Sequence, residues 1–257
     1  MSDSAAAQPA QYPLVRLTRY PARIVQVFRH HGAWKGFGVL VNLSVDRWTD
    51  RRFGISTSRC LPLSQLGIES EDYVDYAPTN YLSFRAALRH CPRELHKDDV
   101  FIDFGAGRGR VLLEAAKLPL RRVIGVEFLP ELADEAEQNL AVASQRVRFR
   151  CGSVEIIQQD ATQYPIPEDA TVLHFFNPFR GPVLEKVIDN LAASLRANPR
   201  RIIVLFANPD DFHRILQKQS PIPPKWVRSD RVVAWPLYQK SEDELGNVYR
   251  IYEIEPS

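Results

Sequence analysis

Residues 100–127 read VFIDFGAGRGRVLLEAAKLPLRRVIGVE, and this stretch decides the fold. It begins with an apolar run that predicts the end of a buried strand. The glycines that follow, Gly105, Gly107 and Gly109, predict a sharp turn, because glycine adopts backbone conformations that other residues avoid. Without Cβ atoms, such a turn also lets a ligand pack directly against the main chain. The stretch therefore predicts a strand that leads into a ligand-binding turn.

A helix and a second strand follow this turn. The apolar positions within 111–117 fall on one side of a helix, whose free N–H groups point back at the turn. The run Val123–Val126 is short and apolar throughout, which is typical of a parallel strand covered on both faces. Glu127 comes at its carboxyl end, where an acid accepts hydrogen bonds from both hydroxyls of a ribose. The sequence thus predicts a cradle for a nucleotide-like cofactor.

The spacing of the glycines indicates which cofactor the turn binds. Dinucleotide-binding folds use Gly-x-Gly-x-x-Gly, with the pyrophosphate at the helix N-terminus. Here Arg110 stands in the place of the third glycine, and Asp103 lies two residues before the first. A carboxylate beside the turn disfavours a pyrophosphate and favours a ligand that carries positive charge. S-adenosylmethionine, with an ammonium and a sulfonium group, is such a ligand.

At these residues the sequence resembles the class I, seven-stranded S-adenosylmethionine-dependent methyltransferases. The resemblance covers roughly residues 76–257 and implies an α/β fold, namely a doubly wound, Rossmann-like sheet of seven strands. It implies that Asp103 lies near the methionine end of the cofactor and that Glu127 binds the ribose. The segment Gln159–Thr162 is similar to the adenine-binding segment of the family, which assigns Asp160 and Ala161 to the cofactor site. The alternative is a fortuitous glycine turn in another α/β protein.

Residues 171–176 form a further apolar strand, which ends in Asn177-Pro178-Phe179. In open α/β sheets ligands bind beyond the carboxyl ends of the strands, so Asn177 should face the transferable methyl group. The segment resembles the Asn-Pro-Pro-aromatic signature of amino-group methyltransferases, with one proline fewer. In the alternative interpretation Pro178 merely ends the strand and Phe179 belongs to the core.

Aromatic residues at the strand ends are candidates for a rim around the acceptor. An apolar rim favours a deprotonated lysine acceptor, because it penalises the charged form. The candidates are Phe128, Phe175, Phe176 and Phe179. Since aromatic residues at strand ends usually belong to the core, most of them are also explained by packing alone.

The segment Asp75-Tyr76-Ala77-Pro78-Thr79-Asn80-Tyr81 precedes a predicted helix. Its Tyr-x-x-Thr pattern is similar to one in Dot-type histone lysine methyltransferases and related bacterial enzymes. That similarity implies a lid, formed by Tyr76 and Thr79, over the carboxylate of the methionine group. In the alternative, Thr79 or Asn80 caps the following helix, and one segment can do both.

The remaining pattern continues the alternation of helices and strands. We expect helices over residues 182–197 and 211–217 and a buried strand over 201–206. Two final strands, over 231–238 and 247–254, flank the polar turn 240–246. They predict the C-terminal antiparallel hairpin that distinguishes the methyltransferase sheet from other Rossmann-like sheets.

Charge is unevenly distributed along the 257 residues. Residues 1–60 contain nine Lys or Arg and three acids, a net charge of +6, whereas the rest contain 24 and 28, a net charge of −4. We therefore divide the chain into a basic, partly helical N-terminal extension over 1–70 and a methyltransferase domain over 71–257. A basic arm with interleaved aromatic residues suits RNA, an anionic membrane or an acidic protein, unless it packs over its own domain.

Other features narrow the class of protein. The three cysteines are scattered and the adjacent His30 and His31 lack a further ligand, so neither a disulfide framework nor a metal site is expected. Neither a leader peptide nor a transmembrane segment is recognisable, which predicts a cytoplasmic protein. The expected function is methyl transfer from S-adenosylmethionine to an unidentified acceptor, first of all a nitrogen of a protein side chain. A small molecule is another possible acceptor. The alternatives are an RNA methyltransferase and a cofactor-binding module without catalysis.

Overall fold

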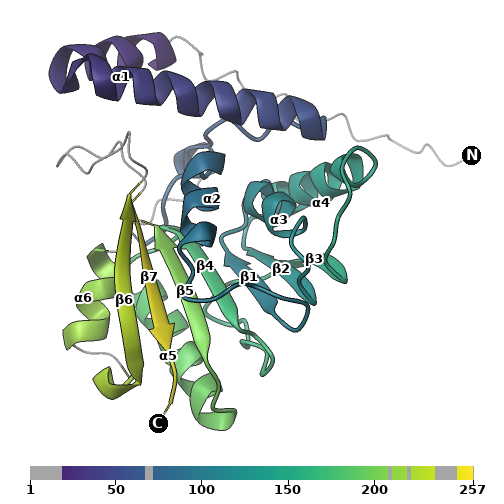
Figure 1. The fold of residues 1–257 in the computed structure, drawn as a ribbon, viewed down its shortest axis with the longest axis vertical. Helices are drawn as coiled ribbons and strands as arrows, with labels where there is room; N and C mark the ends of the chain where they lie inside the picture. Colours follow the sequence, from purple (N-terminus) through teal and green to yellow (C-terminus); the bar gives the residue numbers. More distant parts are fainter. Residues whose placement is uncertain (1–18, 67–71, 208–209, 219–220, 235–247, 257) are drawn as a thin grey trace, which may run out of the picture.

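The computed structural model describes residues 19–66, 72–207, 210–218, 221–234 and 248–256. These residues form a seven-stranded sheet in the order β3-β2-β1-β4-β5-β7-β6, with helices on both faces (Figure 1). The strands are β1 (Val100–Phe104), β2 (Arg122–Glu127), β3 (Ser153–Gln158), β4 (Val172–Phe176), β5 (Ile202–Ala207), β6 (Val227–Ala234) and β7 (Val248–Ile254). This arrangement confirms the predicted doubly wound, Rossmann-like class.

Six α-helices and two short 3₁₀-helices lie among the described residues. The α-helices are α1 (Arg19–Phe53), α2 (Tyr81–Arg89), α3 (Arg110–Ala115), α4 (Pro130–Ser144), α5 (Gly181–Ala197) and α6 (Asp210–Lys218). The 3₁₀-helices are η1 (Leu63–Leu66) and η2 (Pro224–Trp226). Helix α3 ends two residues before the predicted end of its helix, and α6 begins one residue early and ends one residue late.

Strand β1 is central to the position of the site. It pairs in parallel with β2 on one side and with β4 on the other, so the order of the strands reverses there. In such sheets the crevice at the carboxyl ends of the strands binds the ligand. The register places Asp103 of β1 directly beside His174 of β4. Two titratable side chains from distant parts of the sequence thus meet at the point of reversal.

The far edge of the sheet is antiparallel, as the sequence predicts. Strand β7 pairs antiparallel with both β5 and β6, and thus lies between them. The predicted start of the first hairpin strand at residue 231 was wrong, because β6 begins at Val227, directly after η2. The rest of that predicted strand, 235–238, and the predicted turn 240–246 lie outside the described residues.

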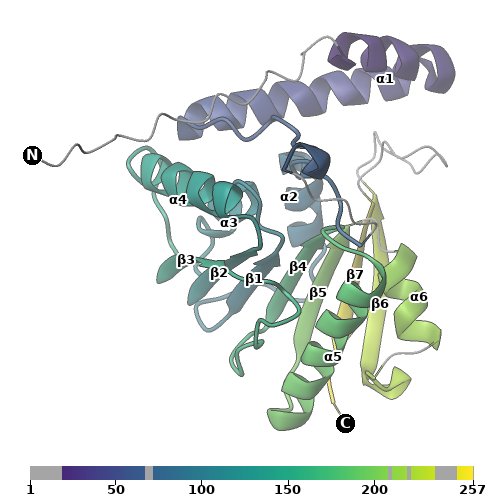
Figure 2. The ribbon, with the colours of Figure 1, turned by 180° about the vertical axis from the view of Figure 1, so that it is seen from behind.

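Apolar side chains cover both faces of the sheet. On one face, α5 and α6 contribute Leu184, Leu191 and Phe212 to a core with the strands, and both helices lie in front of the sheet in Figure 2. On the other face, α2 and α3 contribute Phe84 and Leu112 to a second core. Burial on two faces explains why the parallel strands β1, β4 and β5 are almost wholly apolar.

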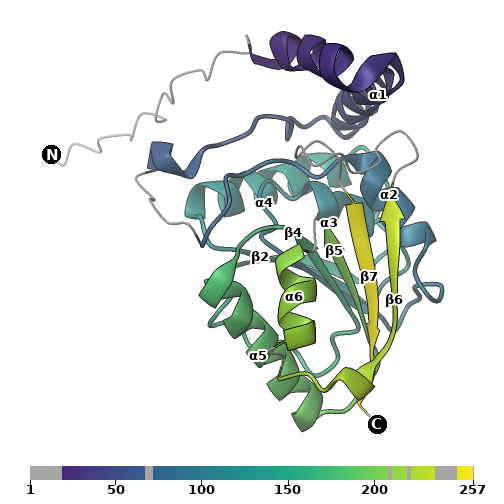
Figure 3. The ribbon, with the colours of Figure 1, turned by 90° about the vertical axis from the view of Figure 1, so that its left-hand side faces the viewer.

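Helix α1 lies beyond α2, at the top of Figure 3. It consists of two helical stretches that meet at Gly32, whose φ of +84° is not helical. Its C-terminal half contacts α2. The predicted boundary at residue 70 stays a prediction. None of the helices described is both long enough and apolar enough to span a membrane.

Candidate active site

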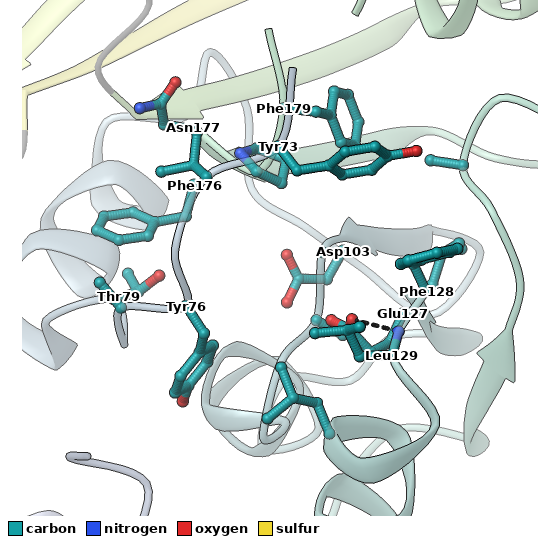
Figure 4. Close-up of a pocket in the computed structure, with 18 of the residues that line it drawn as sticks. Tyr73, Tyr76, Thr79, Asp103, Glu127, Phe128, Leu129, Phe176, Asn177 and Phe179 are labelled. Atoms are coloured by element: carbon teal, nitrogen blue, oxygen red, sulfur yellow. Dashed lines mark hydrogen bonds between the residues drawn. The ribbon is translucent and has the colours of Figure 1, made fainter. Parts of the chain in front are cut away.

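A cavity of about 280 Å³ opens at the carboxyl ends of β1, β2 and β4 (Figure 4). Four segments that are far apart in the sequence supply most of its wall. They are residues 73–79, the glycine turn after β1, residues 126–129 after β2 and residues 176–179 after β4. The predicted cofactor turn, lid and Asn-Pro-Phe segment therefore share one cavity.

The glycine turn packs tightly between two of these segments. The N–H groups of Gly105 and Ala106 both donate to the carbonyl of Val126, at 2.9 and 3.1 Å. Gly105 and Gly107 have positive φ angles, and a Cβ on Gly105 would lie 2.5 Å from Cβ of Pro178. A Cβ on Gly107 would lie 2.2 Å from the ring of Tyr76. Glycine is thus required at both positions by backbone conformation and by packing.

Glu127 joins the end of β2 to this turn. Its side chain is buried, and its two carboxylate oxygens accept hydrogen bonds from the N–H groups of Gly107 at 2.7 Å and Leu129 at 2.9 Å. Burial raises the pKa of the Glu127 carboxyl, although these N–H groups act in the opposite direction. A carboxylate oxygen can accept more than one hydrogen bond, so Glu127 retains acceptor capacity toward the cavity.

Asp103 lies at the floor of the cavity and is held by a histidine that the sequence analysis did not single out. Oδ1 of Asp103 is 2.6 Å from Nδ1 of His174, and Nε2 of His174 is 2.8 Å from the hydroxyl of Tyr249. The three side chains come from β1, β4 and β7, and His174 is completely buried. Burial raises the pKa of Asp103, and His174 counteracts this. The only signal in the sequence was one histidine in an otherwise apolar strand.

Arg110, the residue in the place of the third glycine, connects the turn to α1. Its buried guanidinium donates to Asp46 at 2.9 Å and lies 3.3 Å from Asp50, and both acids are in α1. It also donates to the Thr57 hydroxyl at 2.7 Å and to the Thr79 carbonyl at 3.0 Å. The sequence analysis noted Arg110 only as a departure from a motif, since partners 60 residues away leave no local pattern.

The predicted lid residues both lie on the cavity wall. The ring of Tyr76 covers Gly107, and its hydroxyl donates to the carbonyl of Thr57 at 3.1 Å. Thr79 is buried. Asn80 is at the N-cap position of α2, but its side chain donates to Asp46 at 3.1 Å and caps no N–H group. Side-chain capping by Asn80 is therefore absent.

Asn177 follows β4 with a φ of +46°, the only positive φ of a non-glycine residue among those described. Asparagine tolerates this conformation better than most residues. The carbonyl of Pro178 accepts a hydrogen bond from the N–H of Val74 at 3.3 Å, which ties the segment to residues 72–74. Asn177 is a half-buried residue of the cavity wall, and no hydrogen-bond partner for its amide occurs within the described parts of the chain.

The aromatic candidates divide into two groups. Phe128, Phe176 and Phe179 contribute to the cavity wall. Phe175 does not; it is buried between Phe104 and Phe206, with ring centroids 4.8 and 5.0 Å away. The prediction of Phe175 as a rim residue was therefore wrong, because alternate side chains of a strand point to opposite sides and that of Phe175 faces the core.

The wall includes seven of the ten predicted site residues: Tyr76, Thr79, Asp103, Gly105, Glu127, Ala161 and Asn177. Gly107, Gly109 and Asp160 are not part of it. Gly107 lies under the Tyr76 ring, and Gly109 is the N-cap residue of α3. The carboxylate of Asp160 accepts hydrogen bonds from the N–H and the hydroxyl of Thr162, both at 2.8 Å.

Comparison with known proteins agrees with this geometry. Residues 101–198 match the model of a family described as methyltransferase domain, which is less than half of the chain. The protein carries a methyltransferase domain, and its cofactor is S-adenosylmethionine. The residues fit this cofactor, because two buried carboxylates face one cavity beside a turn that only glycine can form. A comparison with curated proteins gives no match.

Solved structures with similar folds are distant in sequence. An RNA methyltransferase from Salinibacter ruber in complex with S-adenosyl-L-homocysteine is 21% identical, with a TM-score of 0.42, over 70% of this chain and 93% of that one. A precorrin-6y C5,15-methyltransferase from Geobacter metallireducens is 17% identical, with a TM-score of 0.47, over 74% and 93%. These values carry no argument about the acceptor of this protein.

Proposed function

We propose that this methyltransferase acts on a nitrogen atom, with an amine of a protein side chain as the first candidate. The observation that carries the proposal is the position of Asn177. Asn177, whose amide has no partner among the described residues, shares one cavity wall with Asp103 and Glu127, at the carboxyl end of a neighbouring strand. A side-chain amide there can accept a hydrogen bond from an N–H of the acceptor and so orient its lone pair.

The cofactor end follows from the two carboxylates. When bound, S-adenosylmethionine supplies a methyl group on an already activated, positively charged sulfur. Glu127 would accept hydrogen bonds from the ribose hydroxyls, and Asp103 would accept them from the ammonium group. His174 keeps the Asp103 carboxylate in place through the 2.6 Å contact. Asp160 and Ala161 would hold the adenine end, and Tyr76 and Thr79 would cover the methionine carboxylate.

The acceptor end needs little acid–base chemistry of its own. Its main tasks are alignment of the acceptor and exclusion of water. Phe176 and Phe179 contribute apolar surface to the same wall as Asn177, which lowers the pKa of an entering amine and favours its neutral, nucleophilic form. The Pro178 carbonyl already accepts one hydrogen bond, from Val74. A carbonyl oxygen has a second lone pair, so Pro178 can share the orienting role with the amide of Asn177.

A finer assignment concerns the kind of protein acceptor. The pattern from Tyr76 to Thr79 is similar to that of Dot-type lysine methyltransferases, which favours a lysine. Both residues lie on the cavity wall, and the Thr79 carbonyl is fixed by Arg110. A cytoplasmic location stays a prediction.

RNA is the second candidate acceptor, and the charge of the N-terminal extension favours it. Exposed arginines on α1, among them Arg47, Arg51 and Arg52, would suit a phosphate backbone. A third possibility is a module that binds the cofactor without catalysis.

Transfer of a labelled methyl group to cell lysate separates these possibilities. We expect label in the macromolecular fraction that is removed by protease and retained after nuclease. Label removed by nuclease would identify RNA, and label in the low-molecular-weight filtrate a small molecule. Wild type with no transfer above a protein-free blank in any fraction, despite binding of S-adenosylhomocysteine, would identify a module without catalysis.

A further inference from the structure

Helix α1 has two different faces after Gly32. One face packs on the domain through buried side chains, which include Asn42, Asp46, Asp50 and Phe53. The opposite side exposes Trp34, Phe37, Leu40 and Trp48, with 68%, 54%, 40% and 57% of each residue accessible. At about 100° per residue these four positions fall on one side of the helix, and we call them the aromatic face. Since the other side is bound to the domain, the domain itself leaves this face uncovered.

The charges around the aromatic face all have one sign. The only acids of α1, Asp46 and Asp50, are buried and paired with Arg110. Every exposed charged side chain described on α1 is an arginine: Arg29, Arg47, Arg51 and Arg52. The guanidinium of Arg52 lies 5.5 Å from the ring of Trp48. Arg52 thus directly adjoins the aromatic face.

We propose that the aromatic face binds the surface of an anionic lipid membrane. By the same spacing Arg47 lies at the edge of this face, and Arg51 and Arg52 lie within it. A helix with Trp, Phe, Leu and arginines on one side lies in the headgroup region, where apolar side chains enter the acyl boundary and the long arginine side chains extend to anionic headgroups. Trp34 and Trp48 mark the two ends of the face, about 21 Å apart along the helix axis. Tryptophan favours this region because its ring is apolar and its N–H is polar.

Two other occupants fit the surface less well. A second copy of the chain would bring the arginines of two α1 helices together, and like charges repel. RNA would pair with the arginines and stack on the two Trp rings, but it offers no apolar surface to Leu40. An anionic membrane satisfies the aliphatic, aromatic and cationic side chains together. The membrane interaction is independent of the identity of the methyl acceptor.

Binding of the full-length protein to vesicles tests the proposal. We expect co-sedimentation with phosphatidylcholine vesicles that contain phosphatidylglycerol, little with phosphatidylcholine alone, and weakening at high salt. The triple variant Trp34→Gln, Phe37→Gln, Trp48→Gln should bind at least about tenfold more weakly, because it loses the inserting side chains. A second triple variant replaces the arginines: Arg47→Gln, Arg51→Gln, Arg52→Gln. Its affinity for the anionic vesicles should fall about 100-fold, and most of this loss should be lost preference for the anionic lipid.

A matched control carries polar substitutions at exposed apolar residues away from α1. Val142→Gln with Val232→Gln removes side chains of residues that are 39% and 60% exposed and should bind vesicles as wild type does. Thermal melts of all variants must agree, so that lost binding does not reflect lost folding. The proposal is overturned if wild type does not bind anionic vesicles, or if the variant Trp34→Gln, Phe37→Gln, Trp48→Gln binds them as wild type does. It is also overturned if wild type binds a homopolymeric RNA more tightly than the vesicles, or if wild type is a dimer and this triple variant is a monomer.

Discussion

The two ends of the cavity are built differently. At the proposed cofactor end, Asp103 and Glu127 are buried, and each is held by partners at 2.9 Å or less. At the proposed acceptor end, Asn177 is half-buried, has a positive φ, and its amide has no partner within the described residues. One end is therefore preorganised by the protein, whereas the other keeps a polar group available for a molecule that has to be supplied.

This difference explains why the cofactor is easier to identify than the acceptor. A cofactor shared by many enzymes is held by backbone turns and fixed carboxylates, which need particular residues at particular spacings. The acceptor is recognised by a few side chains and by whatever lies around the entrance. If the comparison is right, substitutions at the cofactor end should alter stability or cofactor affinity, and substitutions at the acceptor end should alter turnover.

The largest effect is expected at Arg110. Arg110→Met leaves Asp46 and Asp50 buried without their cation, which should lower the free energy of unfolding by about 3–5 kcal/mol. Hydrogen exchange should also rise in the C-terminal half of α1. The control is Arg122→Met, at a salt bridge that is 32% exposed on the arginine side, where we expect about 1 kcal/mol or less. Equal losses in the two variants, measured by denaturant unfolding, would refute a special role for the Arg110 cluster.

The Arg110 cluster also marks the limit of what the sequence predicts. Several features are recognisable in the sequence because each is a local pattern with fixed spacing. They are the fold class, the glycine turn, Glu127 and the segment after β4. The contacts of Arg110 with α1 and of His174 with Asp103 join residues 60 and 71 positions apart. Such contacts form only once the sheet has brought the segments together, so no periodicity in the sequence predicts them. Phe175 was misplaced for a related reason, since only the register of β4 shows which way it points.

The second largest effect is expected at Asn177, and on turnover. Asn177→Ala should lower methyl transfer by about 100-fold or more, because a misaligned acceptor reacts poorly, while affinity for S-adenosylhomocysteine stays nearly constant. Alanine also meets strain at a φ of +46°. Asn177→Gly removes the amide without this strain and serves as the matched variant. Full turnover in Asn177→Gly, corrected for the folded fraction by thermal melts, would show that the backbone matters and the amide does not.

Glu127 tests the cofactor end through affinity. Glu127→Ala should weaken binding of S-adenosylhomocysteine by about 2–3 kcal/mol, roughly 30- to 150-fold, because the ribose hydroxyls lose a charged acceptor. Isothermal titration calorimetry measures this directly. Glu137→Ala, at an exposed position on α4, is the matched control and should bind as wild type does. An unchanged dissociation constant in Glu127→Ala would place the ribose elsewhere.

The pH dependence of cofactor binding should follow from the same carboxyls. Burial raises the pKa of both Asp103 and Glu127 above their ordinary values, so both protonate at a higher pH than exposed acids do. Because only the carboxylate forms bind the ammonium and the diol fully, affinity for S-adenosylhomocysteine should fall as the pH is lowered from neutral, before the ordinary carboxyl range of about 4 is reached. Affinity that stays constant down to that range would show that neither carboxyl has a raised pKa.

The smallest effect is expected at His174, which acts on the cofactor only through Asp103. Loss of its hydrogen bond should let the Asp103 carboxylate rotate or become protonated. We therefore expect His174→Phe to bind S-adenosylhomocysteine about tenfold more weakly. Methylthioadenosine, which has the ribose and adenine but no amino-acid group, makes no contact with Asp103 and should bind His174→Phe as it binds wild type. His174→Asn, whose amide nitrogen can replace Nδ1 as donor, should recover part of the lost affinity. If His174→Phe weakens the binding of both ligands equally, the histidine supports the fold of the whole cavity and has no specific role at Asp103. That result would argue against the division between a preorganised cofactor end and an open acceptor end.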